Sequence, residues 1–267
     1  MKPVAHPLAP NRSHANLDGS VAALLAVSVA AGGVLVWWSS AAIPHHGVSL
    51  APAAVVGFLG MWLAMVVAMM LPTAMPMVIA TRRVGAPTGR GRSLVLALVT
   101  GYLSIWLAGG AVALLVDVGI RDLLAALSPD AHPMPGMAMP APQAEHAVAS
   151  LIILAAGTFQ LTPLAGRCVR ACRSPFGFFA RGWHGGAGVH GQALRIGVRY
   201  GLSCLGCCAG AMAVLLLVGM EQLWWMAGAG LLMALQKRTS AGIWIARVVG
   251  TLLAVLGFIL VVKVTLM

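Results

Sequence analysis

Three cysteines gather in the segment YGLSCLGCCAGAM, which covers residues 200–212. Cys204, Cys207 and Cys208 lie within five residues of one another, and Met212 follows one helical turn later. If this segment is helical, a rotation of about 100° per residue places the four sulfur atoms on a face about 140° wide. Thiolate and thioether sulfurs are soft ligands that suit Cu(I), so the spacing indicates a metal site. The alternative is that small Cys and Gly residues pack closely against a neighbouring helix.

A second group of sulfur atoms lies in the segment MWLAMVVAMMLPTAMPM. Met61, Met65 and Met69 recur every four residues, so a helix brings them within an arc of about 80°. Such a ladder of thioethers suits Cu(I), although Met also fills irregular helix interfaces without any ligand. Pro72 and Pro76 each remove a backbone donor and predict a kink in this helix. At membrane depth, such a break is tolerated where a cavity or other groups satisfy the backbone.

A Pro- and Gly-rich segment between two apolar runs carries His and Met side chains that could collect copper outside the membrane. These candidate ligands are His132, Met134, Met137, Met139 and His146. An exposed linker with incidental Met is the alternative interpretation. Glu221, in GMEQLWWM, could receive a cation at the outer interface, or it is simply a solvated carboxylate in a turn.

Two further cysteines, Cys168 and Cys172, stand four residues apart in the segment GRCVRACRSP. Three arginines surround them, and nearby cations favour the thiolate form that binds metal or attacks disulfides. If the segment is helical, the two sulfur atoms share one face. The pair is therefore a secondary candidate site, next to the inner surface.

Composition indicates that membrane-spanning helices position these side chains. The chain has 267 residues, of which 60% are hydrophobic and 9% charged, with a mean hydropathy of +0.92. Soluble domains are about 45–50% apolar and about 25% charged, so a typical soluble enzyme is excluded. Runs long enough for spans of about 20 residues lie at 21–43, 53–80, 94–118, 147–165, 198–220 and 242–265, with a shorter one at 223–236. We expect an all-α polytopic transmembrane helical bundle of about seven spans, or six if the short run does not cross.

The charges predict the orientation of the bundle. Seventeen basic and six acidic residues give a net charge of +11. With seven spans and a cytoplasmic N-terminus, fifteen of the seventeen basic residues fall at the inner side, and five of the six acids fall at or near the outer face. This distribution follows the positive-inside rule of a multi-pass protein in the inner (plasma) membrane. The lipid bilayer therefore explains the basic charge without a nucleic-acid partner.

The domain organisation follows from these spans. Residues 1–20 form a polar N-terminal tail, and residues 21–267 form a single transmembrane helical domain. This domain carries an outer Met/His-rich loop at about 119–146 and an inner Cys/Arg-rich loop at about 166–197. At 1.5 Å per residue, Met69 lies roughly 10–12 Å from the inner end of its span, and the cysteines of the 198–220 span lie roughly 6–12 Å deep. The two sulfur groups can therefore meet at one level.

Several of these segments resemble a bacterial family of predicted metal-binding integral membrane proteins, catalogued as a domain of unknown function. The matching pieces are WLAMVVAMMLPTAMP, FQLTPL with CVRACRSP, and GLSCLGCCAGAM with GMEQLWWM. The resemblance implies a polytopic helical membrane protein that binds metal, without an established transport or catalytic cycle. Ala165, Ala209, Glu221 and Gln236 stand where this family commonly has Lys, Trp, Asn and Glu, so no role of those flanking positions carries over.

The leading hypothesis is a membrane protein that binds, transfers or transports Cu(I), with a copper chaperone or a membrane cuproenzyme as partner. Its expected ligands are Cys204, Cys207, Cys208, Met61, Met65, Met69 and Met212. One alternative is a thiol-disulfide oxidoreductase that uses Cys204 and Cys207, since a C-x-x-C pair supports redox exchange. Another is an assembly or interaction protein that holds no metal. A conventional enzyme is not indicated, because no constellation of acid, base and nucleophile emerges.

Overall fold

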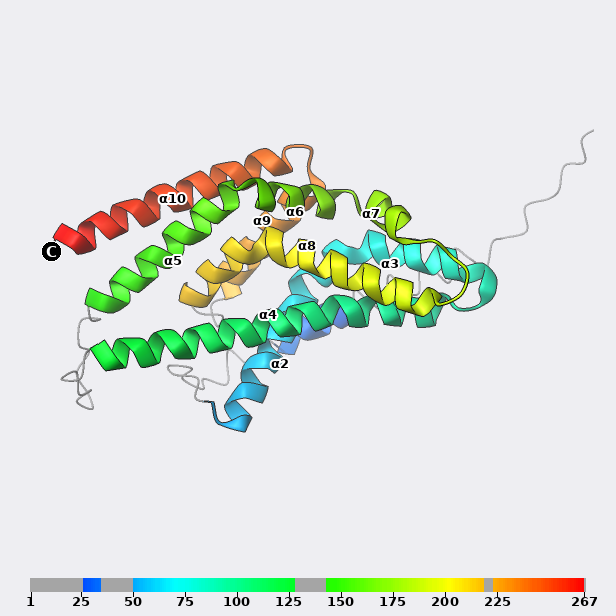
Figure 1. The fold of residues 1–267 in the computed structure, drawn as a ribbon, viewed down its shortest axis with the longest axis horizontal. Helices are drawn as coiled ribbons and strands as arrows, with labels where there is room; N and C mark the ends of the chain where they lie inside the picture. The colour runs from blue at the N-terminus through cyan, green and yellow to red at the C-terminus, as the bar shows by residue number, and fades with distance from the viewer. Residues whose placement is uncertain (1–25, 35–49, 128–142, 219–222, 267) are drawn as a thin grey trace, which may run out of the picture.

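The computed structural model describes residues 26–34, 50–127, 143–218 and 223–266, and this part of the chain is helical without strands (Figure 1). Residues 26–34 form a short helix. The other elements are α2 (Pro52–Met69), α3 (Leu71–Gly85), η1 (Ala86–Thr88), α4 (Gly91–Leu127), α5 (Gln143–Leu161), α6 (Pro163–Arg173), α7 (Pro175–Gly182), α8 (Val189–Val218), α9 (Leu223–Arg238) and α10 (Gly242–Leu266). The all-α prediction is confirmed for these residues.

Five of these helices are long and apolar enough to cross a membrane. They are Pro52–Met69, Gly91–Leu124, Ala144–Leu161, Val189–Leu217 and Gly242–Leu266, and each coincides with a predicted span. The predicted span at 21–43 lies mostly outside the described residues. The run at 223–236 forms α9, whose 16 residues are fewer than the roughly 20 of a typical span. The protein thus has the helices of a membrane protein, while the count of about seven spans and the cytoplasmic N-terminus stay predictions.

The predicted span at 53–80 consists of two helices that meet at Met70. α2 ends at Met69, and α3 begins at Leu71 with Pro72 in its first turn. Proline is tolerated there because the first backbone N–H groups of a helix have no intrahelical partner. Pro76 lies inside α3 without ending it. The kink predicted from Pro72 is therefore observed, and it leaves Met70 at the corner between two helices.

α4 and α8 lie side by side along much of their length (Figure 1). A Cβ atom at Gly101 would collide with the backbone of Leu194, and one at Gly197 would collide with the backbone of Leu98. Small residues at these crossings let the two backbones approach closely, as in other membrane helix pairs. This close pairing brings Tyr102 of α4 against the cysteine-bearing face of α8.

The turn between α5 and α6 directs a third helix onto α8. Thr162 caps α6, and its hydroxyl oxygen accepts a hydrogen bond from the backbone N–H of Ala165 at 3.3 Å. Gly206 of α8 faces α6, because a Cβ atom there would lie 2.7 Å from the Sγ of Cys168. The segment predicted as an inner loop at about 166–197 therefore contains α6, α7 and the start of α8.

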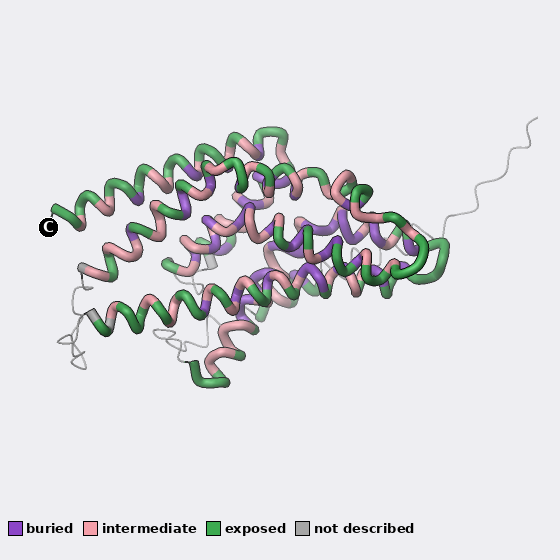
Figure 2. Tube along the Cα trace, viewed as in Figure 1, coloured by how far each residue is buried: buried purple, intermediate pink, exposed green. Residues whose placement is uncertain are grey.

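The buried core gathers where α2, α3, α4, α8 and α9 meet (Figure 2). Trp62 of α2 donates from its indole N–H to the carbonyl oxygen of Trp106 on α4 at 2.8 Å, which ties these two helices together. The core is unusually rich in sulfur: it includes Met61, Met65, Met70, Met77, Cys172, Cys204, Cys207, Cys208, Met212, Met226 and Met233. Large apolar side chains on the outer faces of the helices are exposed, as lipid contact requires.

Candidate metal centre

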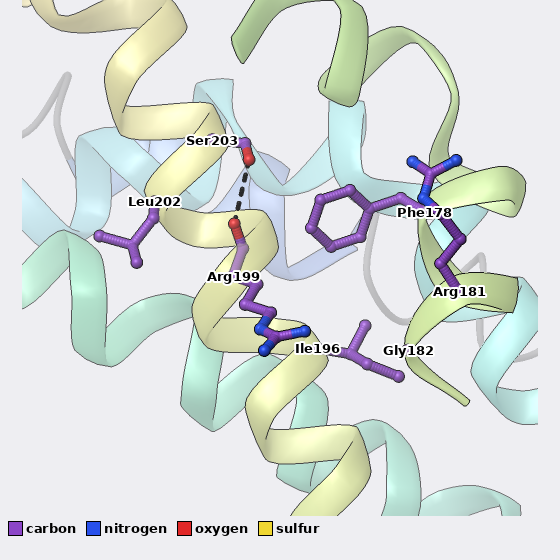
Figure 3. Close-up of a pocket in the computed structure, with 7 residues that line it drawn as sticks. All are labelled: Phe178, Arg181, Gly182, Ile196, Arg199, Leu202 and Ser203. Atoms are coloured by element: carbon purple, nitrogen blue, oxygen red, sulfur yellow. Dashed lines mark hydrogen bonds between the residues drawn. The ribbon is translucent and has the colours of Figure 1, made fainter. Parts of the chain in front are cut away.

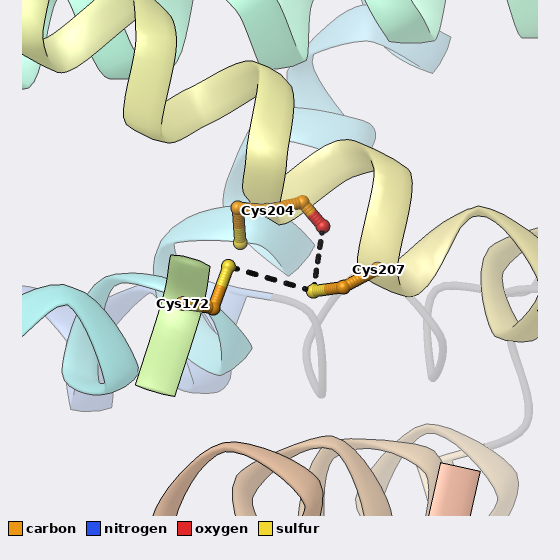
Figure 4. A group of neighbouring side chains, drawn as sticks. All are labelled: Cys172, Cys204 and Cys207. Atoms are coloured by element: carbon orange, nitrogen blue, oxygen red, sulfur yellow. Dashed lines mark hydrogen bonds between the residues drawn. The ribbon is translucent and has the colours of Figure 1, made fainter. Parts of the chain in front are cut away.

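Three cysteine thiols converge in this core, one from α6 and two from α8 (Figure 4). The Sγ atoms of Cys172, Cys204 and Cys207 all lie within 4.8 Å of one another, and all three residues are buried. The Sγ atoms of Cys207 and Cys172 are 3.7 Å apart. Helices distant in sequence therefore bring together thiols that α8 alone could not supply.

Helical spacing arranges the sulfur atoms of α8. Cys204 and Cys207 are three residues apart and so share one face of the helix. The Cys207 thiol lies 3.1 Å from the carbonyl oxygen of Cys204, to which it donates. The Sγ of Cys208 lies 3.4 Å from that of Cys207. All three cysteines of α8 therefore reach the same buried region.

Met70 adds a thioether from the corner between α2 and α3. Its Sδ atom lies 3.9 Å from the Sγ of Cys208, and the side chain is fully buried. The backbone N–H of Met70 donates to the carbonyl oxygen of Val66 at 2.8 Å, so Met70 continues the rotation of α2. It therefore lies about 100° around the helix from Met69, on the face that reaches the cysteines.

A buried lysine from α9 lies within the same group. The Nζ of Lys237 is 3.1 Å from the Sγ of Cys204, 3.3 Å from the Sδ of Met70 and 3.2 Å from the Oγ1 of Thr73. A buried ammonium needs compensating groups, and here they are sulfur and hydroxyl atoms. The positive charge favours a thiolate on Cys204, which is the form that binds metal. Lys237 thus lies in the buried core, beside the cysteines.

Tyr102 of α4 also contacts the thiol of Cys204. Its hydroxyl lies 3.2 Å from the Sγ of Cys204, and its ring packs against that of Tyr200 with centroids 6.0 Å apart. Both tyrosines are buried. The Sγ of Cys204 therefore contacts both the hydroxyl of Tyr102 and the ammonium group of Lys237 within the buried core.

The three-cysteine group has the dimensions of a metal site. A thiolate–metal bond of about 2.3 Å, as found for zinc, places the sulfurs of a trigonal site about 4.0 Å apart. The observed separations of 3.7 Å for one pair and at most 4.8 Å for all three bracket that value. The neighbouring thioether of Met70 favours a soft ion, since thiolate and thioether together select Cu(I). The donor set therefore fits Cu(I) as a bound cargo.

The other predicted ligands occupy several different places. Met61, Met65 and Met212 lie in the same buried core, whereas Met69 is half-buried and faces Gly230 of α9. Cys168 is half-buried and lies against Gly206, and His146 is exposed near the start of α5. The remaining candidates lie outside the described residues: His132, Met134, Met137, Met139 and Glu221. Roles for all of these side chains stay predictions.

Four residues of the centre are not among the ligands predicted from the sequence: Met70, Thr73, Tyr102 and Lys237. Met70 continues the rotation of α2, since its N–H donates to the carbonyl oxygen of Val66, so no local signal separates it from the neighbouring methionines. For Lys237 the only signal is its position directly after an apolar helical run. Tyr102 and Thr73 carry no local signal, since their role depends on tertiary contacts.

A separate surface cavity of about 360 Å³ lies between α7 and α8, lined by arginine and apolar side chains (Figure 3). Arg181 and Arg199 lie on its two sides, and Ser203 donates from its hydroxyl to the carbonyl oxygen of Arg199 at 3.1 Å. The residues that line it include no sulfur ligand. Guanidinium groups repel a metal cation, so this cavity is distinct from the metal centre.

The fold and the centre together define a polytopic helical membrane protein with a buried cysteine and methionine cluster suited to a soft metal ion. The chain matches the family of PpoB2 copper chaperones over residues 59–260, and it belongs to that family. The match covers every cysteine of the chain, together with Met70 and Lys237. No curated protein and no solved structure matches the chain.

Proposed function

We propose that this protein is an integral membrane copper chaperone that holds Cu(I) on Cys172, Cys204 and Cys207 and passes it to a membrane cuproenzyme. The observation that carries the proposal is the convergence of the three buried thiols within 4.8 Å of one another. Membership of a copper chaperone family supports copper as the ion. The five apolar helices support a position within the membrane.

Cys208 and Met70 give the bound ion further ligands close by. Their sulfur atoms are 3.9 Å apart, and the Sγ of Cys208 is 3.4 Å from that of Cys207. Cu(I) can therefore exchange one sulfur for the next without leaving a sulfur environment, as release to a partner requires. Each coordinating thiol loses its proton when it binds the ion, and the charge of Lys237 offsets part of the negative charge that results.

We extend the proposal to the membrane arrangement expected from the sequence. The protein lies in the inner membrane with its N-terminus in the cytoplasm, and its tail at 1–20 precedes a single transmembrane domain at 21–267. The Met/His-rich segment at about 119–146 collects copper at the outer face. Cys168 lies toward the inner surface, where Arg167 and Arg170 of α6 are exposed.

The copper content of purified full-length protein tests the proposal. Protein prepared without oxygen and loaded with Cu(I) should hold about one ion per chain, since the three thiols surround a single position. The double variant Cys204→Ser/Cys207→Ser should lose most of that copper. Cys168→Ser is the matched control and should keep it, because Cys168 lies outside the three-thiol group. Equal copper in all three proteins would refute the proposed site.

A further inference from the structure

A groove of about 650 Å³ runs between α9 and the α2–α3 corner. From α9 it is lined by Met226, Gly230, Ala234 and Arg238, which are spaced four residues apart and so follow one face of the helix. At 1.5 Å per residue, these positions span about 18 Å, nearly the full length of α9. The groove is therefore an elongated passage along one side of α9.

Two thioethers line this passage. Met226 lies near the N-terminal end of α9, and Met69 contributes from the end of α2. A Cβ atom at Gly230 would lie 3.1 Å from the Cε of Met69, so the absence of a side chain at Gly230 leaves room for Met69. The passage therefore offers soft ligands for Cu(I) ahead of the cysteines.

The passage adjoins the metal centre at Thr73. Thr73 lines the groove, and its Oγ1 accepts a hydrogen bond from the Nζ of Lys237 at 3.2 Å. The same Nζ contacts the Sδ of Met70 and the Sγ of Cys204. The ammonium group of Lys237 thus lies between a residue of the groove and a residue of the cysteine cluster.

The two ends of the groove differ in charge. Arg238 lines the end next to the C-terminus of α9, where its guanidinium donates to the carbonyl oxygen of Pro72 at 3.3 Å. A fixed positive charge repels an approaching cation. At the other end, the lining residue is the uncharged thioether of Met226. Charge and ligand chemistry therefore both favour access for Cu(I) at the Met226 end.

We propose that this groove conducts Cu(I) to the cysteine centre, with Met226 and Met69 as successive ligands and Lys237 as the side chain that moves aside to admit the ion. The inference rests on the proposed function of the centre. Each step is a ligand exchange, in which one copper–sulfur bond breaks as the next forms and copper stays monovalent. On arrival, the thiols that coordinate the ion lose their protons, which pass out of the buried site to bulk solvent.

The rate of loading tests this inference separately from the capacity of the centre. Full-length protein in bilayer nanodiscs is mixed with Cu(I) supplied as its coloured bicinchoninate complex, and loss of colour is followed in time. For Met69→Leu/Met226→Leu, the loading rate should fall about tenfold or more, which is a modest change in barrier height, while the final copper content stays at the wild-type value. Met233→Leu is the matched control on α9, because Met233 is buried but does not line the groove.

A second variant keeps both thioethers. Gly230→Ala adds a methyl group 3.1 Å from Met69, and it should slow loading by displacing that side chain, again with unchanged final content. Wild-type loading rates in both the double variant and Gly230→Ala would overturn the passage and leave the proposed centre standing. Loss of final copper content in a folded double variant would also overturn it, because the two methionines would then belong to the resting site. A wild-type protein that takes up no copper would refute the proposed function itself.

Discussion

The ammonium group of Lys237 lies 3.1 Å from the Sγ of Cys204 inside the helical bundle. No carboxylate pairs with this lysine among the described residues, where the salt bridge joins Arg121 to Asp117 far along α4. Among the described residues, the group nearest to this ammonium that can carry a negative charge is the thiol of Cys204. This contact links α9 to α8 and places a positive charge beside the proposed copper ligands.

Removal of the lysine charge should weaken copper binding. We expect Lys237→Gln to raise the dissociation constant for Cu(I) by about tenfold, or about 1.4 kcal/mol, because the thiolates lose their nearest cation. Competition against a Cu(I) chelator measures this change. Lys263→Gln, at an exposed position of α10, should bind copper as the wild type does. An unchanged affinity for Cu(I) in Lys237→Gln would mean that the ammonium group does not stabilise the copper-bound protein.

Replacement of the thioether at the helix corner should alter the ligand shell. Met70→Leu conserves volume, so we expect little loss of stability but a decrease in Cu(I) affinity of roughly three- to tenfold. Met75→Leu is the control, because Met75 is buried on α3 outside the sulfur-rich core. The same chelator competition applies, with thermal unfolding as the check on folding. Equal affinities of the two variants would remove Met70 from the proposed ligands.

Close packing of α6 on α8 should be needed for the third thiol. In Gly206→Ala, the new methyl group would lie 2.7 Å from the Sγ of Cys168, so either that side chain or α6 must shift. Overpacking of this kind costs about 1–3 kcal/mol in stability, and we expect it to lower copper content by displacing Cys172. Gly60→Ala, where nothing lies within 4 Å, should bind copper normally. Full copper content in Gly206→Ala would contradict this prediction, because the centre would then not need α6 to pack closely on Gly206.

Thiol labelling should distinguish Cys168 from the centre. Cys168 is the half-buried cysteine, whereas the other four are buried, so a maleimide should modify it alone in the folded protein. Burial raises the pKa of the Cys168 thiol, so labelling should be slow at about pH 7 and accelerate as the pH rises and the thiolate forms. Mass spectrometry of the folded protein and of Cys168→Ser measures this. Labelling of Cys204 or Cys207 without unfolding would contradict the buried position of the centre.

Hydropathy and helical spacing account for much of the fold and for part of the site. The apolar runs predict the five long helices because a membrane span needs about 20 apolar residues. Spacing of three residues places Cys204 and Cys207 on one face, and Pro72 predicts the break in the methionine segment. These features depend on local sequence, which is why they can be read without a structure.

The remaining features of the centre depend on tertiary contacts. The four-residue spacing of the methionines favours Met69 as a ligand, but the neighbouring face of α2 is the one that brings Met70 to Cys208. Cys172 is expected only as a secondary ligand at the inner surface, whereas packing of α6 brings it among the thiols of α8. The positive-inside rule predicts only the side of the membrane on which a lysine lies. It cannot predict that Lys237 contacts the buried sulfur of Cys204.

X-ray absorption at the copper edge of the loaded, full-length protein tests the central claim most directly. We predict monovalent copper surrounded only by sulfur, at about 2.3 Å as for other thiolate–metal bonds, with fewer sulfur ligands in Cys172→Ser. Cys168→Ser should give the wild-type spectrum. Copper bound by nitrogen or oxygen, or a spectrum unchanged in Cys172→Ser, would contradict a centre built from α6 and α8.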